Sequence, residues 1–121
     1  MNAVIDSNIL LDNLNGVAAA RTEMARYETA TISVVTWIEV MAGAADESEA
    51  LHLRAFLATF ALQELTQEIA DRAASIRRTS RLRLPDAIIR ATADALGQLL
   101  VTRNTRDFDA RDPAIRIPYR V

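Results

Sequence analysis

Short apolar runs alternate along this chain with stretches of helical character, and this alternation limits the folds open to it. Four runs are typical of buried strands, and a fifth is typical of an edge strand because Pro118 ends it. The five runs cover residues 3–5, 30–33, 61–65, 98–101 and 115–117. Strands that alternate with helices form a parallel sheet with helices on both faces, so the sequence predicts an α/β fold.

Turn and capping residues mark the helices between these runs. Asn15-Gly16 is a turn dipeptide that separates the first two helices, and Gly97 stops the last one. Asp46 and Thr66 are favourable N-cap residues, and Pro85 suits a first helical turn. Six helices are therefore expected over residues 7–14, 17–27 and 34–43, from Asp46, from Thr66, and over 85–96.

Four carboxylates fall near the ends of the predicted strands. Asp6 directly follows the first strand, and Asp107 lies shortly after the fourth. Glu39 lies two helical turns after the second strand, and Asp86 lies in the first turn of the helix that leads into the fourth. Sites in parallel sheets form beyond the carboxyl ends of the strands. We expect the four carboxylates to meet there if the helices of Glu39 and Asp86 point inward.

The residues that are absent narrow the chemistry of such a site. The chain has no cysteine, no phosphate-cradling glycine loop and a single histidine, His52, which cannot form a multi-histidine zinc site alone. A cluster of carboxylates without histidine or cysteine is a hard-oxygen environment. It favours Mg²⁺ or Mn²⁺ over zinc.

Each carboxylate also has a simpler structural interpretation. Asp6 can cap the helix that follows it. Glu39 completes a capping box with Thr36, although a helix that begins near Ser33 leaves Glu39 inside an apolar segment. Asp86 is electrostatically favourable at a helix start without any function. No single carboxylate therefore decides between a structural and a catalytic role.

Charge is distributed unevenly along the chain. Residues 1–71 hold 3 arginines and 11 acids, a net charge of −8, whereas residues 72–121 hold 11 arginines and 5 acids, a net charge of +6. There is no lysine, and guanidinium groups suit bidentate recognition of phosphate. Arginine without lysine is equally typical of a GC-rich genome. The asymmetry points to an anionic partner for the second half.

Length and composition predict a single domain over residues 1–121. No apolar run approaches the roughly 18 residues needed to span a bilayer, and the start does not resemble a secretory signal. Because the chain has no cysteine, we expect a cytoplasmic location. We also expect no membrane association.

Four stretches of the chain carry a further signal: VIDSNILLD (4–12), ISVVTWIEVMAG (32–43), LRLPDAIIRATADALG (82–97) and LLVTRNTRDF (99–108). In this order they resemble the motifs of the PIN-domain family, most closely the small VapC-type toxins of bacterial toxin–antitoxin pairs. The first resembles the family's strand-Asp-Thr-Asn opening, with Ser7 in the usual threonine place. The second resembles a Ser/Thr-rich entry to a helix that bears a glutamate.

The resemblance implies a fold and an acidic site. The fold is a three-layer α/β/α sandwich on a small parallel sheet of four to five strands. Asp6, Glu39 and Asp86 would form the acidic triad, and Ser7 would support Asp6. Many relatives carry a further acid where this chain has Asn104, so Asp107 would supply that charge instead. Whether one or two metal ions bind is therefore left open.

The implied activity is Mg²⁺-dependent or Mn²⁺-dependent endoribonuclease cleavage, commonly of tRNA or ribosomal RNA. Asp6 and Asp86 would ligate the metal, Glu39 would orient or deprotonate the attacking water, and Asp107 with Asn104 would complete the shell. The arginines nearest to the site in sequence would hold the RNA backbone. They are Arg83, Arg103 and Arg106.

The resemblance also implies partners: a homodimer, and a cognate antitoxin whose C-terminal segment masks the acidic groove. The main alternative is a PIN-type module that binds nucleic acid or a partner without cleaving it. The missing acid at position 104 supports that alternative, and the presence of Asp6, Glu39 and Asp86 counts against it. A purely structural α/β subunit, in which each acid is a cap, is the third interpretation.

Overall fold

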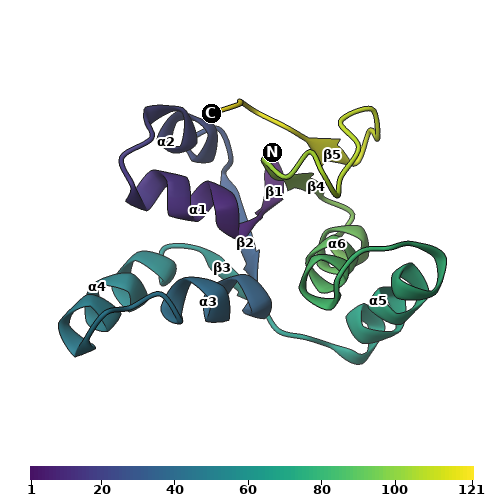
Figure 1. Cartoon of the computed structure of the whole chain (residues 1–121), viewed down its shortest axis with the longest axis horizontal. Coiled ribbons are helices and arrows are strands. Elements are labelled where there is room, and N and C mark those ends of the chain that lie inside the picture. Colours follow the sequence, from purple (N-terminus) through teal and green to yellow (C-terminus); the bar gives the residue numbers. More distant parts are fainter.

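The computed structural model describes residues 1–121 and contains five strands and six helices (Figure 1). The strands are β1 (Asn2–Ile5), β2 (Thr29–Ser33), β3 (Ala61–Gln63), β4 (Leu99–Val101) and β5 (Ile115–Arg116). The helices are α1 (Ser7–Leu14), α2 (Ala18–Met24), α3 (Val34–Met41), α4 (Glu47–Leu57), α5 (Gln67–Thr79) and α6 (Leu84–Leu96). Every predicted strand and helix is present, and the predicted α/β fold is confirmed.

The five strands form one sheet in the order β3-β2-β1-β4-β5, and every pairing is parallel. β1 is the central strand, where Ala3 pairs with Ala30 on one side and Leu99 on the other. The chain first builds outward through β2 and β3, and then returns to the opposite side of β1 for β4 and β5. The strand order therefore reverses between β1 and β4, where open α/β sheets form their binding sites.

Helices cover both faces of the sheet. Successive side chains of β1 point to opposite faces, so Ala3 and Ile5 pack under α1, α2, α3 and α4, whereas Val4 packs under α6. Figure 1 shows α1 and α2 on one side of the sheet and α6 with α5 on the other. α5 is the outer helix of this pair and packs on α6 through Ile69 and three alanines: Ala73, Ala87 and Ala91. The predicted three-layer arrangement is confirmed.

Local signals explain where two of the site-bearing helices begin and end. Ser33 caps α3 because its Oγ accepts a 3.1 Å hydrogen bond from the Val35 amide. Glu39 therefore lies inside α3, not in a capping box with Thr36. α6 ends at Gly97, which adopts φ +64°, a conformation that costs glycine little.

Two helices are shorter than the sequence predicts. α3 ends at Met41, two residues before its predicted end at Gly43. α2 stops at Met24 instead of reaching residue 27, because residues 25–28 turn the chain into β2 and the Glu28 amide already donates to the Met1 carbonyl. None of the six helices is long and apolar enough to cross a membrane.

Candidate active site

Asp6 lies at the carboxyl end of β1, at the point where the strand order reverses. Its backbone amide donates to the Val101 carbonyl of β4 at 2.9 Å. Its Oδ1 accepts from the Ser7 amide at 2.7 Å, so Asp6 does cap α1, as its structural interpretation expects. Its Oδ2 accepts from the Thr102 hydroxyl, also at 2.7 Å. Asp6 is only 3% exposed, and this burial raises its pKa although these hydrogen bonds lower it.

Glu39 and Asp86 reach the same place from α3 and α6. Partial burial raises the pKa of Glu39, the Ser7 hydroxyl lowers it, and the charges of Asp6 and Asp86 raise it further. Burial likewise raises the pKa of Asp86, together with the charges of Asp6 and Asp107. Each of the four predicted carboxylates thus lies within electrostatic reach of at least one other. The structure brings them to one edge of the sheet, as the strand ends predict.

Little positive charge offsets this cluster. Its nearest cation is Arg83, whose Nε lies 3.9 Å from Oδ2 of Asp86 and whose side chain is 80% exposed. Asp6 and Glu39 take part in no ion pair. A set of carboxylate oxygens without a paired cation matches the donor preference of Mg²⁺ and Mn²⁺.

The spacing of the carboxylates is wider than a closed metal site. No three His, Cys, Asp or Glu side chains converge closely enough to hold an ion as they stand. Like charges repel when no cation lies between them, and this repulsion favours the wider spacing. The donor chemistry therefore fits a divalent ion, and the side chains would have to draw together around it.

Asn104 and Asp107 form a reciprocal pair in the loop after β4. The Asn104 Nδ2 donates to Oδ2 of Asp107 at 2.9 Å, and the Asp107 amide donates to Oδ1 of Asn104 at 3.2 Å. Asn104 thus fixes the orientation of the carboxylate three residues later. Ser7 has a similar supporting place, because its Oγ lies 3.4 Å from Oδ1 of Asp6.

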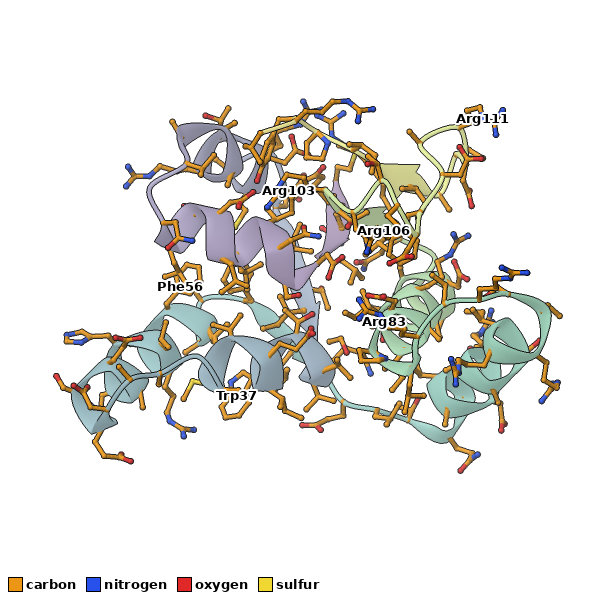
Figure 2. All side chains as sticks on the ribbon, in the orientation of Figure 1. Trp37, Phe56, Arg83, Arg103, Arg106 and Arg111 are labelled. Carbon is orange, nitrogen blue, oxygen red and sulfur yellow. The ribbon has the colours of Figure 1, made fainter.

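The three arginines expected near the site differ in their surroundings. Arg83 and Arg106 are exposed and line an open groove of about 390 Å³ beside the carboxylates (Figure 2). No apolar residue lines this groove; its other lining residues are Asn8, Arg103, Asn104, Thr105 and Asp107. Arg103 also contributes to the groove, but its guanidinium is paired with Asp12 through hydrogen bonds of 2.7 and 3.0 Å.

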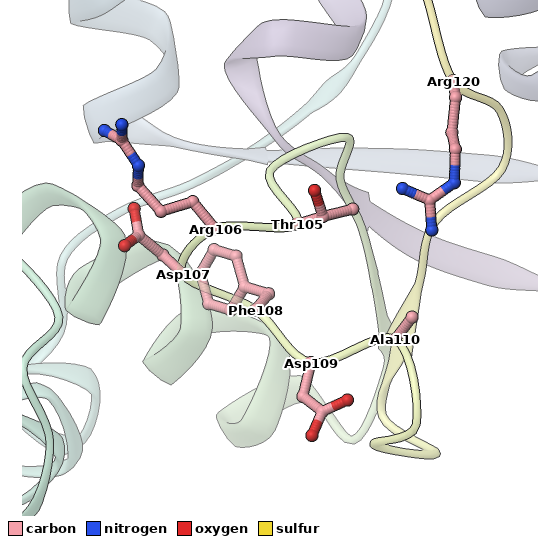
Figure 3. A pocket seen from close by; sticks show the side chains of 7 residues that line it. All are labelled: Thr105, Arg106, Asp107, Phe108, Asp109, Ala110 and Arg120. Atoms are coloured by element: carbon pink, nitrogen blue, oxygen red, sulfur yellow. The ribbon is translucent and has the colours of Figure 1, made fainter.

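A second hollow lies on the other side of the same loop. It measures about 380 Å³ and shares Thr105, Arg106 and Asp107 with the first groove. Arg106 and Asp107 extend to one side of the loop, and Arg120 lies on the other (Figure 3). The loop after β4 is therefore flanked by open, largely polar surface on both sides.

Three polar residues at this site have no role predicted from the sequence: Asn8, Asp12 and Thr102. Thr102 is fully buried and contacts Asp6 directly. A signal for it exists, because Thr102 directly follows β4 as Asp6 directly follows β1. Asn8 and Asp12 lie one helical turn apart, on one face of α1, just after Asp6.

The motif arrangement and this geometry agree with a comparison of the sequence with known families. The PIN domain profile matches residues 3–112. The chain belongs to the PIN-domain family. This PIN domain is 36% identical over 115 residues to Ribonuclease VapC10 of Mycobacterium tuberculosis, covering 87% of this chain and 84% of the relative. The predicted resemblance to VapC-type ribonuclease toxins is confirmed.

Solved structures give the same grouping. A toxin–antitoxin complex from Klebsiella pneumoniae contains a chain that is 39% identical, with a TM-score of 0.91 over 98% of this PIN domain and 99% of that chain. FitAcB from Neisseria gonorrhoeae shares the fold at 22% identity, with a TM-score of 0.81 over the full length of both chains. DNA-bound VapBC from Salmonella typhimurium shares it at 23% identity, with a TM-score of 0.77 over 97% of this chain and 96% of that chain.

Proposed function

We propose that this PIN domain is a Mg²⁺-dependent endoribonuclease toxin that hydrolyses phosphodiester bonds in RNA and is neutralised by an antitoxin. One observation carries the proposal: Asp6, Glu39 and Asp86 lie within electrostatic reach of one another where the strand order reverses, with raised pKa values and little compensating charge. Similarity to a ribonuclease supports the reaction class. Structured RNAs with unstacked loops, such as tRNA or ribosomal RNA, are the proposed substrates.

In this proposal, Asp6, Asp86 and Asp107 hold the ion, and Glu39 completes its environment. Mg²⁺, or Mn²⁺ in its place, would supply neutralisation of phosphate charge and a lower pKa for coordinated water. Asp6 is suited to a fixed ligand because Ser7 and Thr102 both hold its carboxylate in one orientation. Asn104 holds Asp107 in the same way. Whether the four acids hold one ion or two is left open.

Glu39 is the proposed general base. Glu39 is the most exposed residue of the triad, and its raised pKa brings it nearer to the pH range in which it can accept a proton. The attacking water oxygen forms a new bond to phosphorus while the bond to the leaving ribose oxygen breaks. The proton of the water passes to the Glu39 carboxylate, and the leaving ribose oxygen takes a proton from solvent to become a hydroxyl.

Arg83 and Arg106 are the proposed phosphate contacts. Both are exposed at the groove, and neither is held in a close ion pair. Arg83 lies three residues before Asp86, and Arg106 directly precedes Asp107. Contacts to phosphate give affinity but carry no sequence information. The choice of the cleaved bond must then come from the shape of the RNA.

We further propose that the antitoxin binds along α1, α3 and α4 and reaches the acidic groove. A hollow of about 420 Å³ between these helices is lined by Leu11, Leu14, Val40 and Leu53, and both Leu11 and Leu14 are at least 40% exposed. A basic side chain of the antitoxin would pair with the carboxylates and exclude the ion. A homodimer is also proposed. Light scattering on the free toxin and on the purified complex tests both assemblies.

The decisive test separates the charge of Asp6 from its capping role. Asparagine caps helices as well as aspartate does, so Asp6→Asn keeps the cap of α1 and removes the carboxylate. Asp46→Asn is the matched control, because Asp46 caps α4 through the Glu49 amide and lies at an exposed helix start. Both variants and the wild type are incubated with total RNA, with Mg²⁺ or with EDTA.

We expect cleavage by the wild type and by Asp46→Asn in Mg²⁺, and none by Asp6→Asn or in EDTA. Equal cleavage by Asp6→Asn, or cleavage that persists in EDTA, would rule out the proposed site. If no variant cuts any RNA but all bind it, the chain is instead a non-catalytic binding module.

A further inference from the structure

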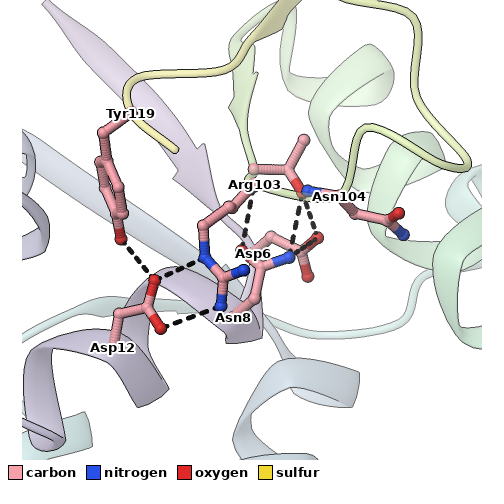
Figure 4. A network of polar contacts seen from close by, with 7 residues as sticks. Asp6, Asn8, Asp12, Arg103, Asn104 and Tyr119 are labelled. Carbon is pink, nitrogen blue, oxygen red and sulfur yellow. Dashed lines mark hydrogen bonds and ion pairs between the residues drawn. The ribbon is translucent and has the colours of Figure 1, made fainter. Parts of the chain in front are cut away.

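One face of α1 holds the start of the loop that carries Asp107. The Asn8 Oδ1 accepts a 3.1 Å hydrogen bond from the Arg103 amide, and its Nδ2 donates to the Thr102 hydroxyl at 3.2 Å. One turn later, Asp12 binds the Arg103 guanidinium through both carboxylate oxygens. Figure 4 shows these contacts, with Asp6 beside them. The helix that Asp6 caps is therefore also the support of the loop after β4.

The pair of Asp12 and Arg103 is well shielded and further braced. Asp12 is 7% exposed, and the Tyr119 hydroxyl donates to its Oδ2 at 2.8 Å. The Arg103 hydrogen bonds hold the pKa of Asp12 below its usual range. Three separate segments meet here: α1, the loop after β4, and the C-terminal residues around Tyr119.

We propose that Asp12 and Arg103 form a clamp that sets the position of Asp107 relative to Asp6, and that Arg103 acts through this clamp and not as a phosphate contact. The proposal rests on the proposed function, because it concerns the geometry of the same acidic site. Asp12 is a positioning residue: it touches neither the carboxylate cluster nor the groove, and it acts through Arg103.

The contacts give a route for this effect. Arg103 lies between Thr102, which bonds Asp6, and Asn104, which bonds Asp107. The Asn104 amide also donates to the Thr102 hydroxyl at 3.1 Å. Fixing Arg103 therefore fixes Thr102 and Asn104, and through them the carboxylates of Asp6 and Asp107. Two hydrogen bonds join the Arg103 guanidinium to the shielded Asp12 carboxylate, whose negative charge offsets its positive charge. Binding a phosphate instead would leave the shielded carboxylate without its partner.

The chain contains a second ion pair of the same design, which provides a matched control. Arg116 of β5 binds both carboxylate oxygens of Glu23 in α2, at 2.6 and 2.9 Å, and the Tyr27 hydroxyl donates to Glu23 at 2.6 Å. Glu23 is 4% exposed. None of these side-chain bonds involves the loop that carries Asp107. Loss of this pair should cost stability without moving the acidic site.

The test compares Asp12→Asn, Arg103→Gln and the double variant with Glu23→Gln. Mn²⁺ binding is titrated without RNA by electron paramagnetic resonance of the free ion, and thermal unfolding is measured for each variant. RNA cleavage is then measured as kcat and KM in Mg²⁺ at several salt concentrations. Arg103→Lys is added as a variant that keeps the charge but loses the bidentate fork.

We expect Asp12→Asn and Arg103→Gln each to weaken Mn²⁺ binding about tenfold or more and to lower kcat, with KM for RNA within about twofold of the wild type. The double variant should be no worse than either single variant, since both remove one clamp. Arg103→Lys should restore part of the loss. Glu23→Gln should lower the unfolding temperature and leave Mn²⁺ binding unchanged.

The opposite pattern would overturn the inference. If Arg103→Gln raises KM and lowers the salt dependence while Asp12→Asn behaves as the wild type, Arg103 is a phosphate contact. If the wild type binds Mn²⁺ and the clamp variants bind it equally well, the clamp fails and the proposed nuclease site stands. If the wild type itself binds no Mn²⁺ and cuts no RNA, the proposed function fails, and the clamp inference fails with it.

Discussion

The Thr102 hydroxyl donates a 2.7 Å hydrogen bond to Oδ2 of Asp6, between the residues that directly follow β4 and β1. Thr102 is fully buried, and its oxygen also accepts from Asn8 and from the Asn104 amide. One hydroxyl thus links the end of β4 to the carboxylate at the end of β1, where the strand order reverses. The orientation of Asp6 depends on a residue 96 positions away in the sequence.

Replacing Thr102 with valine keeps its shape and removes this donor. Burial raises the pKa of Asp6 and the Thr102 bond lowers it, so Thr102→Val should raise that pKa further. Asp6 then stays protonated to a higher pH, and the acidic limb of the pH–rate profile should move toward higher pH. The free energy of unfolding of Thr102→Val should be about 1–3 kcal/mol lower than that of the wild type. Thr102→Ser keeps the hydroxyl, and an acidic limb shifted equally in both variants would contradict the role of the bond.

The stability of the metal-free protein should depend on pH through Asp6. Because burial raises the pKa of Asp6 in the folded state, the folded protein binds this proton more tightly than the unfolded chain. The bound proton stabilises the folded protein fully below the ordinary Asp pKa of 3.8, and this stabilisation is lost as pH rises through the pKa of Asp6 in the folded state. At pH 7 without divalent ions, Asp6→Asn should therefore unfold at a higher temperature than the wild type.

The gap between the two proteins should narrow as pH falls toward 3.8, and thermal unfolding across this range measures it. Added Mg²⁺ should raise the unfolding temperature of the wild type and leave Asp6→Asn nearly unchanged. A wild type that is more stable than the variant at pH 7 in EDTA would contradict the burial of an uncompensated charge.

Much of the fold and part of the site could be predicted because their signals are local. Asp6 directly follows an apolar strand, Ser33 and Gly97 mark helix ends, and the alternation of strands and helices places the carboxyl ends together. Convergence of Glu39 with Asp6 follows from the same logic once α3 begins at Val34. These predictions needed only the rules of capping and parallel topology.

The side-chain pairs between distant segments could not be predicted, because they leave no periodic trace in the sequence. Nearness to Asp107 in sequence assigns Arg103 to RNA, but its guanidinium is held by Asp12, 91 residues earlier. Tyr119 joins the same pair from 107 residues after Asp12. The sequence alone does not show that the Arg103 guanidinium is already paired with Asp12 within the fold.

Position 104 can be tested by placing there the acid that the motif resemblance implies. In Asn104→Asp, a second carboxylate replaces the amide that donates to Asp107 at 2.9 Å. Without divalent ions, repulsion between the two carboxylates should lower the unfolding temperature. With Mn²⁺ present, the added charge should tighten binding, which titration of the free ion measures. Looser Mn²⁺ binding would show that the Asn104 hydrogen bond matters more than an added charge.

Arg106 should contribute to RNA affinity through one phosphate. Arg106→Gln should raise KM and reduce the slope of log affinity against log salt by about one, with kcat little changed. Arg111→Gln is the control, since Arg111 lies farther along the same segment, is exposed, and pairs with Asp109 at 3.0 Å. Figure 2 shows Arg111 apart from Arg83 and Arg106. Equal effects of both substitutions would indicate a general charge effect and no specific contact.

The pairing of β1 with β4 also governs when the site can exist during synthesis. Asp6 is made 96 residues before Thr102, its hydrogen-bond partner, and Ala3 meets Leu99 only after the same interval. At roughly 5–20 residues per second, Asp6 waits about 5–20 s for Thr102. Until then the growing chain holds one half of its acidic edge. A toxin built this way stays inert on the ribosome until β4 and the loop after it have been made.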